Sequence, residues 1–199
     1  MIDPTDSTHI AAELLPCEVP LSDGRVCVLR EMTVEDAAGI LEFLPLTHAE
    51  TDFVNYMTGE FDWTLEREQE FLRSRMSNPL SISMAAEVDG RIIGLGGAAS
   101  GELKRMQHHA EIGLAILKEF WGQGIGRRIM EINIEWGRRA GLRKMYLRVV
   151  DYNERARRMY EAIGFIEEAR LREDVLRADG SYGNTITMAL MYDEHDPRP

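Results

Sequence analysis

Three glycines stand close together in the stretch "EFWGQGIGRRIM", residues 119–130, at Gly122, Gly124 and Gly126. Glycine loses the most backbone freedom on folding, so such a cluster indicates a sharp turn or a close approach to the backbone. From Ile125 onward, apolar residues recur at steps of four, three and four, as on one face of a helix. The helix therefore begins among the glycines. Its exposed amide groups and its dipole favour the binding of an anion such as phosphate.

This glycine pattern matches neither of two common nucleotide-binding motifs. The P-loop needs a Lys followed by Ser or Thr, and the Rossmann motif needs a third glycine where Ile129 stands. Arg127 and Arg128 lie near the positive end of the helix dipole, where positive side chains are unfavourable. A bound polyanion would explain why two arginines stand there. The alternative is a tight strand-to-helix turn that binds nothing.

Glu111 is the first candidate for proton transfer. It lies in the strand-like run "AEIGLAIL", residues 110–117, just before the glycines. By alternation it shares a face with Gly113 and Ala115, which leave room above the sheet. A carboxylate there can act as a general base for an amine. Alternatively, the carboxylate faces solvent or is satisfied by a neighbour such as His109.

Tyr160 is the second candidate. It lies in "NERARRMYEAIGF", residues 153–165, where helical spacing places it on an apolar face together with Ala156, Met159 and Ile163. Asn153 is suited to cap the start of this helix and Gly164 to end it. A core tyrosine with an ordinary cap is the alternative explanation.

The sequence does not predict a metal site. His108 and His109 are adjacent in a strand, so their side chains face opposite ways and cannot easily bind one metal ion together. Both histidines are expected at the surface or at the rim of a site. Cys17 and Cys27 form no CxxC pair and no metal-ligand cluster. They are expected to be buried or free thiols in a reducing cytosol.

Composition indicates one globular domain. The chain has 199 residues, of which 44% are apolar and 29% charged, and its formal net charge is -11. This charge argues against nucleic acid and anionic membranes as partners. The first residues lack the pattern of a secretory signal, and no apolar run approaches the roughly 20 residues that span a bilayer. A cytoplasmic location is expected.

The pattern of elements predicts an α/β or α+β fold with a mixed, partly antiparallel sheet. Residues 1–20 contain three prolines and are expected to be an irregular lead-in, followed by a domain over residues 21–194. Helices are expected from Thr33 and over 64–76, the latter with Leu65, Leu72 and Met76 on one face. Strands are expected at 25–32, on both sides of Asp89-Gly90, and at 108–117, 144–150 and 185–192.

Three of these segments together resemble a known family. The strand "AEIGLAIL", the turn "WGQGIGRRIM" and the segment "VVDYNERARRMYEAIGF" are similar to the GNAT superfamily of acetyl-CoA-dependent N-acetyltransferases. They are most similar to the branch with ribosomal-protein and polyamine acetyltransferases, and the likeness covers about residues 25–192. The family signature, Gln or Arg followed by xxGxG or xxGxA, falls on residues 121–126 with Trp121 at its first position. The resemblance implies a mostly antiparallel sheet flanked by helices.

The resemblance also implies roles for individual residues. Backbone amides of residues 122–127 would hold the pyrophosphate of coenzyme A, with Arg127 or Arg128 adding charge. The strand end at Ile116 and Leu117 would splay from its neighbour and bind the pantetheine arm. Glu111 would be the general base and Tyr160 the acid that protonates the thiolate. The cofactor-binding residues are then Ile116, Leu117, Gly122, Gln123, Gly124, Ile125, Gly126, Arg127 and Asn153.

The implied function is transfer of an acetyl group from acetyl-CoA to a primary amine by direct attack. The acceptor would be a small cationic amine, an antibiotic or a protein N-terminus. The alternatives are transfer of another acyl group, a non-catalytic acyl-CoA-binding sensor or scaffold, and a pure interaction protein. The strand at 185–192 suggests a possible homodimer.

The two early helices and their link usually form one wall of the acceptor site in this family. Carboxylates and aromatic rings alternate there and suit a cationic amine. The alternative is a solvated acidic helix face with core aromatics. The residues are Glu50, Asp52, Glu60, Asp62, Glu66, Glu68 and Glu70, with Phe53, Tyr56, Phe61 and Trp63.

Overall fold

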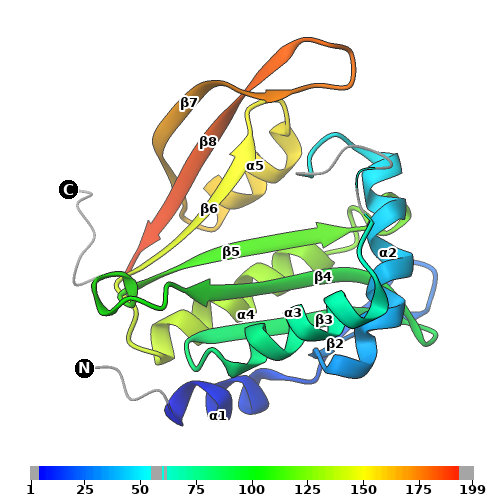
Figure 1. Cartoon of the computed structure of the whole chain (residues 1–199), viewed down its shortest axis with the longest axis vertical. Coiled ribbons are helices and arrows are strands. Elements are labelled where there is room, and N and C mark those ends of the chain that lie inside the picture. Colours follow the sequence, from blue (N-terminus) through cyan, green and yellow to red (C-terminus); the bar gives the residue numbers. More distant parts are fainter. Residues whose placement is uncertain (1–4, 55–59, 61, 193–199) are drawn as a thin grey trace.

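The computed structural model describes residues 5–54, 60 and 62–192 (Figure 1). Its centre is an eight-stranded sheet in the order β1-β2-β3-β4-β5-β6-β8-β7. Every neighbouring pair is antiparallel except β5 and β6, which are parallel. The predicted fold class is confirmed. The strands are β1 (Cys17–Pro20), β2 (Val26–Glu31), β3 (Ser81–Val88), β4 (Arg91–Ser100), β5 (His109–Ile116), β6 (Lys144–Val150), β7 (Ile166–Leu176) and β8 (Tyr182–Met191).

Helices cover both faces of this sheet (Figure 1). One face is covered by α2 (Ala37–Glu50) and α3 (Leu65–Ser77), which pack against each other and against β4 and β3. The other is covered by α1 (Thr5–Leu14) and α4 (Ile125–Arg139). The helix α5 (Glu154–Ala162) follows β6. A side chain at Gly96 of β4 would approach Ile129 of α4 to 2.4 Å, so this glycine lets α4 pack closely on the sheet.

Several predicted turns and caps are confirmed. Asp89 and Gly90 have positive φ angles of 51° and 78° and connect β3 to β4 as a tight hairpin. The amide of Thr33 donates to the Asp36 carboxylate at 2.7 Å, as a capping box requires. The Thr64 hydroxyl accepts from the amide of Arg67 at 3.3 Å at the start of α3. These elements were predictable because their determinants lie within a few residues of one another.

The expected irregular lead-in is wrong. Residues 5–14 form α1 and residues 17–20 form β1, and Ile10, Ala11 and Leu15 are buried in the main core. Of the prolines that suggested irregular structure, Pro4 lies outside the described residues, Pro16 lies between the two elements, and Pro20 lies at the end of an edge strand, where proline is tolerated. Thr33 caps a short 3-10 helix, Val34–Asp36, and α2 follows it and continues through Pro45 to Glu50.

Two further expectations differ from the structure. Of the three apolar residues predicted for one face of α3, Leu72 is buried, whereas Leu65 and Met76 are exposed, so the predicted apolar face is wrong at both ends. The strand β7 was not predicted, because nearly all of its side chains are exposed and its sequence carries no alternation. It lies at the sheet edge next to β8. None of the helices in the described part of the chain is long and apolar enough to cross a membrane.

Candidate active site

The parallel strands β5 and β6 separate after a short paired stretch. Their register runs only from His109 opposite Lys144 to Glu111 opposite Tyr146. Beyond that point β5 stays paired with β4, and β6 stays paired with β8 (Figure 1). The predicted splay is confirmed. We call the resulting space the β5–β6 gap, and Glu111 and Tyr146 are the last paired residues at its closed end.

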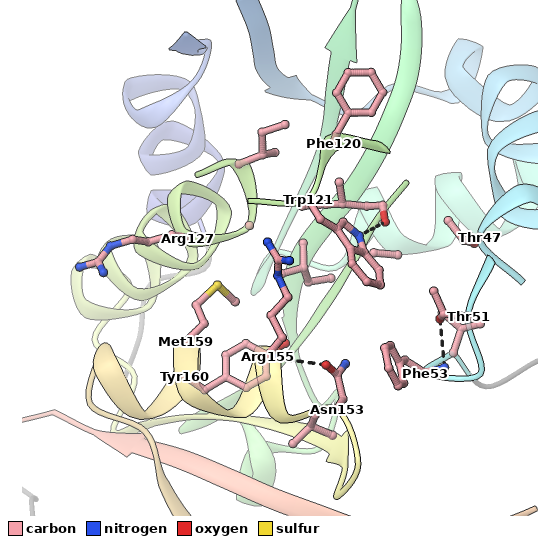
Figure 2. Close-up of a pocket in the computed structure, with 18 of the residues that line it drawn as sticks. Thr47, Thr51, Phe53, Phe120, Trp121, Arg127, Asn153, Arg155, Met159 and Tyr160 are labelled. Atoms are coloured by element: carbon pink, nitrogen blue, oxygen red, sulfur yellow. Dashed lines mark hydrogen bonds between the residues drawn. The ribbon is translucent and has the colours of Figure 1, made fainter. Parts of the chain in front are cut away.

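A pocket occupies the open part of this gap (Figure 2). Its walls come from the end of β5, the glycine turn, the start of α4, β6, α5 and the end of α2. Segments far apart in the sequence therefore converge on it. Among the lining residues are Leu114, Ala115, Ile116, Gly122, Gly124, Ile125, Gly126, Arg127, Arg148, Asn153, Arg155, Met159, Tyr160, Thr47, Thr51 and Phe53.

The glycine turn presents backbone to this pocket. Gly122 and Gly124 have φ angles of +84° and +85°, in the left-handed region that favours glycine. The amide of Arg128 makes the first hydrogen bond of α4, to the Gly124 carbonyl at 3.0 Å. The amides of residues 125–127 precede that bond and have no acceptor within the helix. The predicted anion-binding helix start therefore lies at the pocket.

Gly124→Ala is expected to lower the free energy of unfolding by about 1–2 kcal/mol, because an L-residue pays that penalty in the left-handed region. A steric clash does not contribute to this loss, because no atom lies within 4 Å of the position that the alanine Cβ would take. Gly113→Ala is the matched control, because it has equal space and no left-handed φ. Chemical denaturation measures both. Equal stability of the two variants would contradict the left-handed turn.

The positive charge at the turn differs from the prediction. Arg127 lines the pocket, but its Nε donates to Glu131 Oε1 at 3.0 Å and its side chain points away from the pocket (Figure 2). Arg128 Nε donates to Cys17 Sγ at 3.1 Å. Both arginines therefore bind side chains of the protein.

Arg155 is the arginine that the sequence analysis missed. A side chain at Gly122 would lie 3.1 Å from a terminal nitrogen of Arg155, and the guanidinium lies 5.6 Å from the centre of the Trp121 ring. Within the described residues it has no carboxylate partner within 4 Å. Arg155 stands in the first turn of α5, where a basic residue is as unfavourable for the helix dipole as at Arg127. The same argument could have found it.

Three predicted cofactor residues have other contacts. Gln123 Oε1 accepts from the amide and the hydroxyl of Ser22, at 3.0 and 3.1 Å. Leu117 is buried, and its amide donates to the Ile93 carbonyl at 2.9 Å. Neither residue lines the pocket. Ile116 does, and its carbonyl accepts from Trp121 Nε1 at 2.7 Å (Figure 2).

Tyr160 and Asn153 both line the pocket from α5. Tyr160 is 8% exposed, and burial raises its pKa to about 12. Its hydroxyl is therefore protonated at neutral pH and can donate a proton or a hydrogen bond. Asn153 caps α5 as predicted, because its Oδ1 accepts from the amide of Ala156 at 3.2 Å (Figure 2).

Glu111 lies at the closed end of the β5–β6 gap and does not itself line the pocket. Its Oε1 accepts from Arg148 Nε at 2.9 Å, and its Oε2 accepts from the Tyr146 hydroxyl at 3.1 Å. Arg148 connects it to the pocket, which it lines. His109 instead packs its ring against Tyr146. The space predicted above Gly113 is present, since nothing lies within 4 Å of a side chain built there.

Three of the seven carboxylates expected along the acceptor wall make other contacts or are buried. Glu50 Oε2 accepts from the amide of Lys118 at 2.7 Å, and Asp52 lies 3.7 Å from Arg177. Glu68 is 2% exposed, and burial raises its pKa. Among the described lining residues the charged ones are arginines, and none is a carboxylate. Phe53 lines the pocket, whereas Tyr56 and Phe61 lie outside the described residues.

Comparison with known proteins identifies the family. The model of the acetyltransferase (GNAT) family matches residues 46–165. The chain belongs to this family. Over 110 residues it is 29% identical to spermidine N(1)-acetyltransferase of Escherichia coli K12, which covers 55% of this chain and 58% of that enzyme. The chain thus matches somewhat more than half the length of this curated relative.

Solved structures support the same family. A GNAT acetyltransferase from Streptococcus pneumoniae has a TM-score of 0.79 and 28% identity, covering 83% of this chain and 99% of that one. A putative acetyltransferase from Salmonella typhimurium, solved with its cofactor acetyl-CoA, has a TM-score of 0.74 and 18% identity, covering 87% and 98%. Ribosomal-protein-alanine N-acetyltransferase from Brucella melitensis has a TM-score of 0.72 and 19% identity, covering 82% and 99%.

The last two structures are too distant in sequence to show more than the fold. The family match confirms the predicted GNAT membership and the acetyltransferase class, and acetyl-CoA as acetyl donor agrees with it. Within the described residues, His, Cys, Asp and Glu form no group of three or more suited to a metal ion.

Proposed function

We propose that this GNAT protein transfers an acetyl group from acetyl-CoA to a primary amine. The observation that carries the proposal is the β5–β6 gap. It runs from the glycine turn at the start of α4 to the pair of Glu111 and Tyr146, with Tyr160 in its wall. A diphosphate-binding turn, an open strand edge, a carboxylate and a phenol lie in the order that such a transfer needs.

The described residues fit coenzyme A. Amides at the start of α4 and the Arg155 guanidinium suit the pyrophosphate, because both attract negative charge. The unpaired edge of β5 over residues 114–116 suits an amide-containing arm, which would bind it as an added strand does. Asn153 and Tyr160 would line the opposite side of that arm.

Each catalytic residue then has one task. Acetyl-CoA supplies the activated acetyl group as a thioester. An alkyl ammonium has a pKa of about 10.4, so the amine must lose a proton before it attacks. Glu111 takes that proton, directly or through a water molecule, while Arg148 and Tyr146 fix the orientation of its carboxylate. Tyr160, kept protonated by burial, gives a proton to the departing sulfur and regains the second proton that the attacking nitrogen loses as the amide forms.

Acetyl transfer is tested by measuring thiol release from acetyl-CoA against small amines and peptides. Release that depends on the amine supports the proposal, and the named relatives justify including spermidine and a peptide with N-terminal alanine. Coenzyme A binding without release for any acceptor would instead favour an acyl-CoA sensor. A cytoplasmic location and a homodimer remain predictions.

Arg155→Gln is expected to weaken coenzyme A binding about 10- to 150-fold, because hydrogen bonds to charged groups contribute about 1.5–3 kcal/mol. Arg158→Gln is the control, since Arg158 is an exposed arginine of the same helix that pairs with Glu154. Calorimetric titration with coenzyme A measures both. Equal dissociation constants for the two variants would remove Arg155 from the cofactor site.

A further inference from the structure

A row of side chains crosses the sheet at the closed end of the β5–β6 gap. The register places Ser81 opposite Ala99, Ala99 opposite Glu111, and Glu111 opposite Tyr146. Directly opposite residues share a face of the sheet, so these four side chains project toward the same side. The Ser81 hydroxyl donates to the Arg75 carbonyl at 2.9 Å, so this is the face covered by α3. Ser81 and Ala99 are small and leave space for a long side chain from α3.

Arg75 lies in the last turn of α3, and its backbone carbonyl accepts from Ser81 at the start of this row. It is partly buried, and burial lowers its pKa, while the negative charge of Glu111 acts in the opposite direction. Within the described residues no carboxylate lies within 4 Å of its guanidinium, and no hydrogen bond of that guanidinium is present. A partly desolvated cation without a partner is unfavourable unless a ligand supplies the anion.

Arg148 brings a second guanidinium to Glu111. Arg148 uses its Nε for Glu111 Oε1, and its side chain is 58% exposed where it lines the pocket. A guanidinium has five N–H donors, so most of those of Arg148 are free for a further acceptor. Glu111 thus binds Arg148 of β6 directly and interacts electrostatically with Arg75 of α3.

We propose that the amine acceptor of this site carries a carboxylate next to its primary amine, as a free amino acid does, and that Arg75 and Arg148 bind this carboxylate. The proposal rests on the function proposed above, in which Glu111 receives the proton of the amine. A zwitterion matches the alternating charges of the site. A polyamine would instead place additional positive charge beside two guanidinium groups, and such like-charge contacts reduce affinity.

The contacts of two carboxylates that were expected to line the acceptor wall also support this proposal. Glu50 and Asp52 contact groups of the protein itself, and neither residue lines the pocket. Glu111 lies at the closed end of the gap, and its two oxygens already accept from Arg148 and Tyr146. One ammonium group can join that arrangement, and the guanidinium groups beside it suit a neighbouring anion.

The test uses pairs of acceptors in which one member carries the carboxylate next to the amine and the other lacks it. Ornithine is compared with putrescine, methionine with 3-(methylthio)propylamine, and each amino acid with its amide, which keeps a primary amine and lacks the negative charge. Thiol release from acetyl-CoA gives kcat/KM for each. We expect at least a tenfold preference for the carboxylate-bearing member, as charged hydrogen bonds of this kind provide.

Arg75→Gln is expected to reduce this preference toward one by raising KM for the amino acid, and Arg75→Lys to retain part of it. Arg73→Gln, an exposed arginine of the same helix, is the control and should keep the wild-type preference. Thermal unfolding verifies that each variant is folded. The proposal would be overturned if the wild type preferred the decarboxylated amines. It would also be overturned if Arg75→Gln lowered kcat/KM equally for the amino acid and for its partner without the carboxylate. If the wild-type protein releases no thiol with any acceptor, the result instead contradicts the proposed function.

Discussion

Tyr160→Phe is expected to lower kcat by about 10²–10⁴-fold, the usual contribution of a general acid. The phenol is buried in the pocket wall, and its raised pKa of about 12 keeps it protonated over the working pH range. The substitution removes the hydroxyl and keeps the ring, so packing against Phe165 is retained. Steady-state kinetics with a saturating acceptor measures the loss.

The affinity for coenzyme A should stay nearly the same in Tyr160→Phe, because the proposed contact forms with the sulfur as it leaves. Tyr192→Phe is the control, since the Tyr192 hydroxyl donates to the Ile134 carbonyl of α4, away from the pocket lining. That variant should lose stability and keep its kcat. A wild-type kcat in Tyr160→Phe would end the assignment of Tyr160 as the acid.

Glu111→Gln is expected to lower kcat/KM by about 10²–10⁴-fold and to change the shape of its pH profile. Glutamine keeps the size of the side chain, and its amide oxygen can still accept from Arg148 while its NH2 group faces the Tyr146 oxygen, but it cannot take a proton from the amine. The pH dependence of kcat/KM, measured from acid to alkaline pH, separates this effect from a general loss of structure.

Glu135→Gln is the matched control for that variant. Glu135 binds Arg138 and Arg139 on the exposed side of α4, so its removal affects surface ion pairs and leaves the gap intact. Its pH profile should follow that of the wild type. If Glu111→Gln also follows the wild-type profile, another group or a chain of water molecules serves as the base.

The parts of the site that were predictable from the sequence depend on local information. The glycine turn, the Asn153 cap and the inward position of Tyr160 each follow from residues within one or two helical turns. The same holds for the hairpin at Asp89-Gly90. In each case the types of neighbouring residues determine the backbone conformation or show the helical period.

The parts that were missed depend on contacts between distant segments. Glu111 and Arg148 are 37 residues apart, and Gln123 binds Ser22 across 101 residues. Such pairs are set by the register of β5 and β6 and by the packing of the glycine turn, which no short window contains. The position of Arg75 likewise depends on α3 lying over Ser81. The exposed strand β7 gave no alternating pattern because both of its faces are exposed.

The most direct test of this account is a crystal structure of the protein with coenzyme A. The account predicts pyrophosphate oxygens at hydrogen-bond distance, about 2.7–3.2 Å, from amides of residues 122–127, with the thiol arm in the β5–β6 gap beside Tyr160. Coenzyme A bound elsewhere, or a glycine turn without the pyrophosphate in crystals that contain the bound ligand, would contradict it.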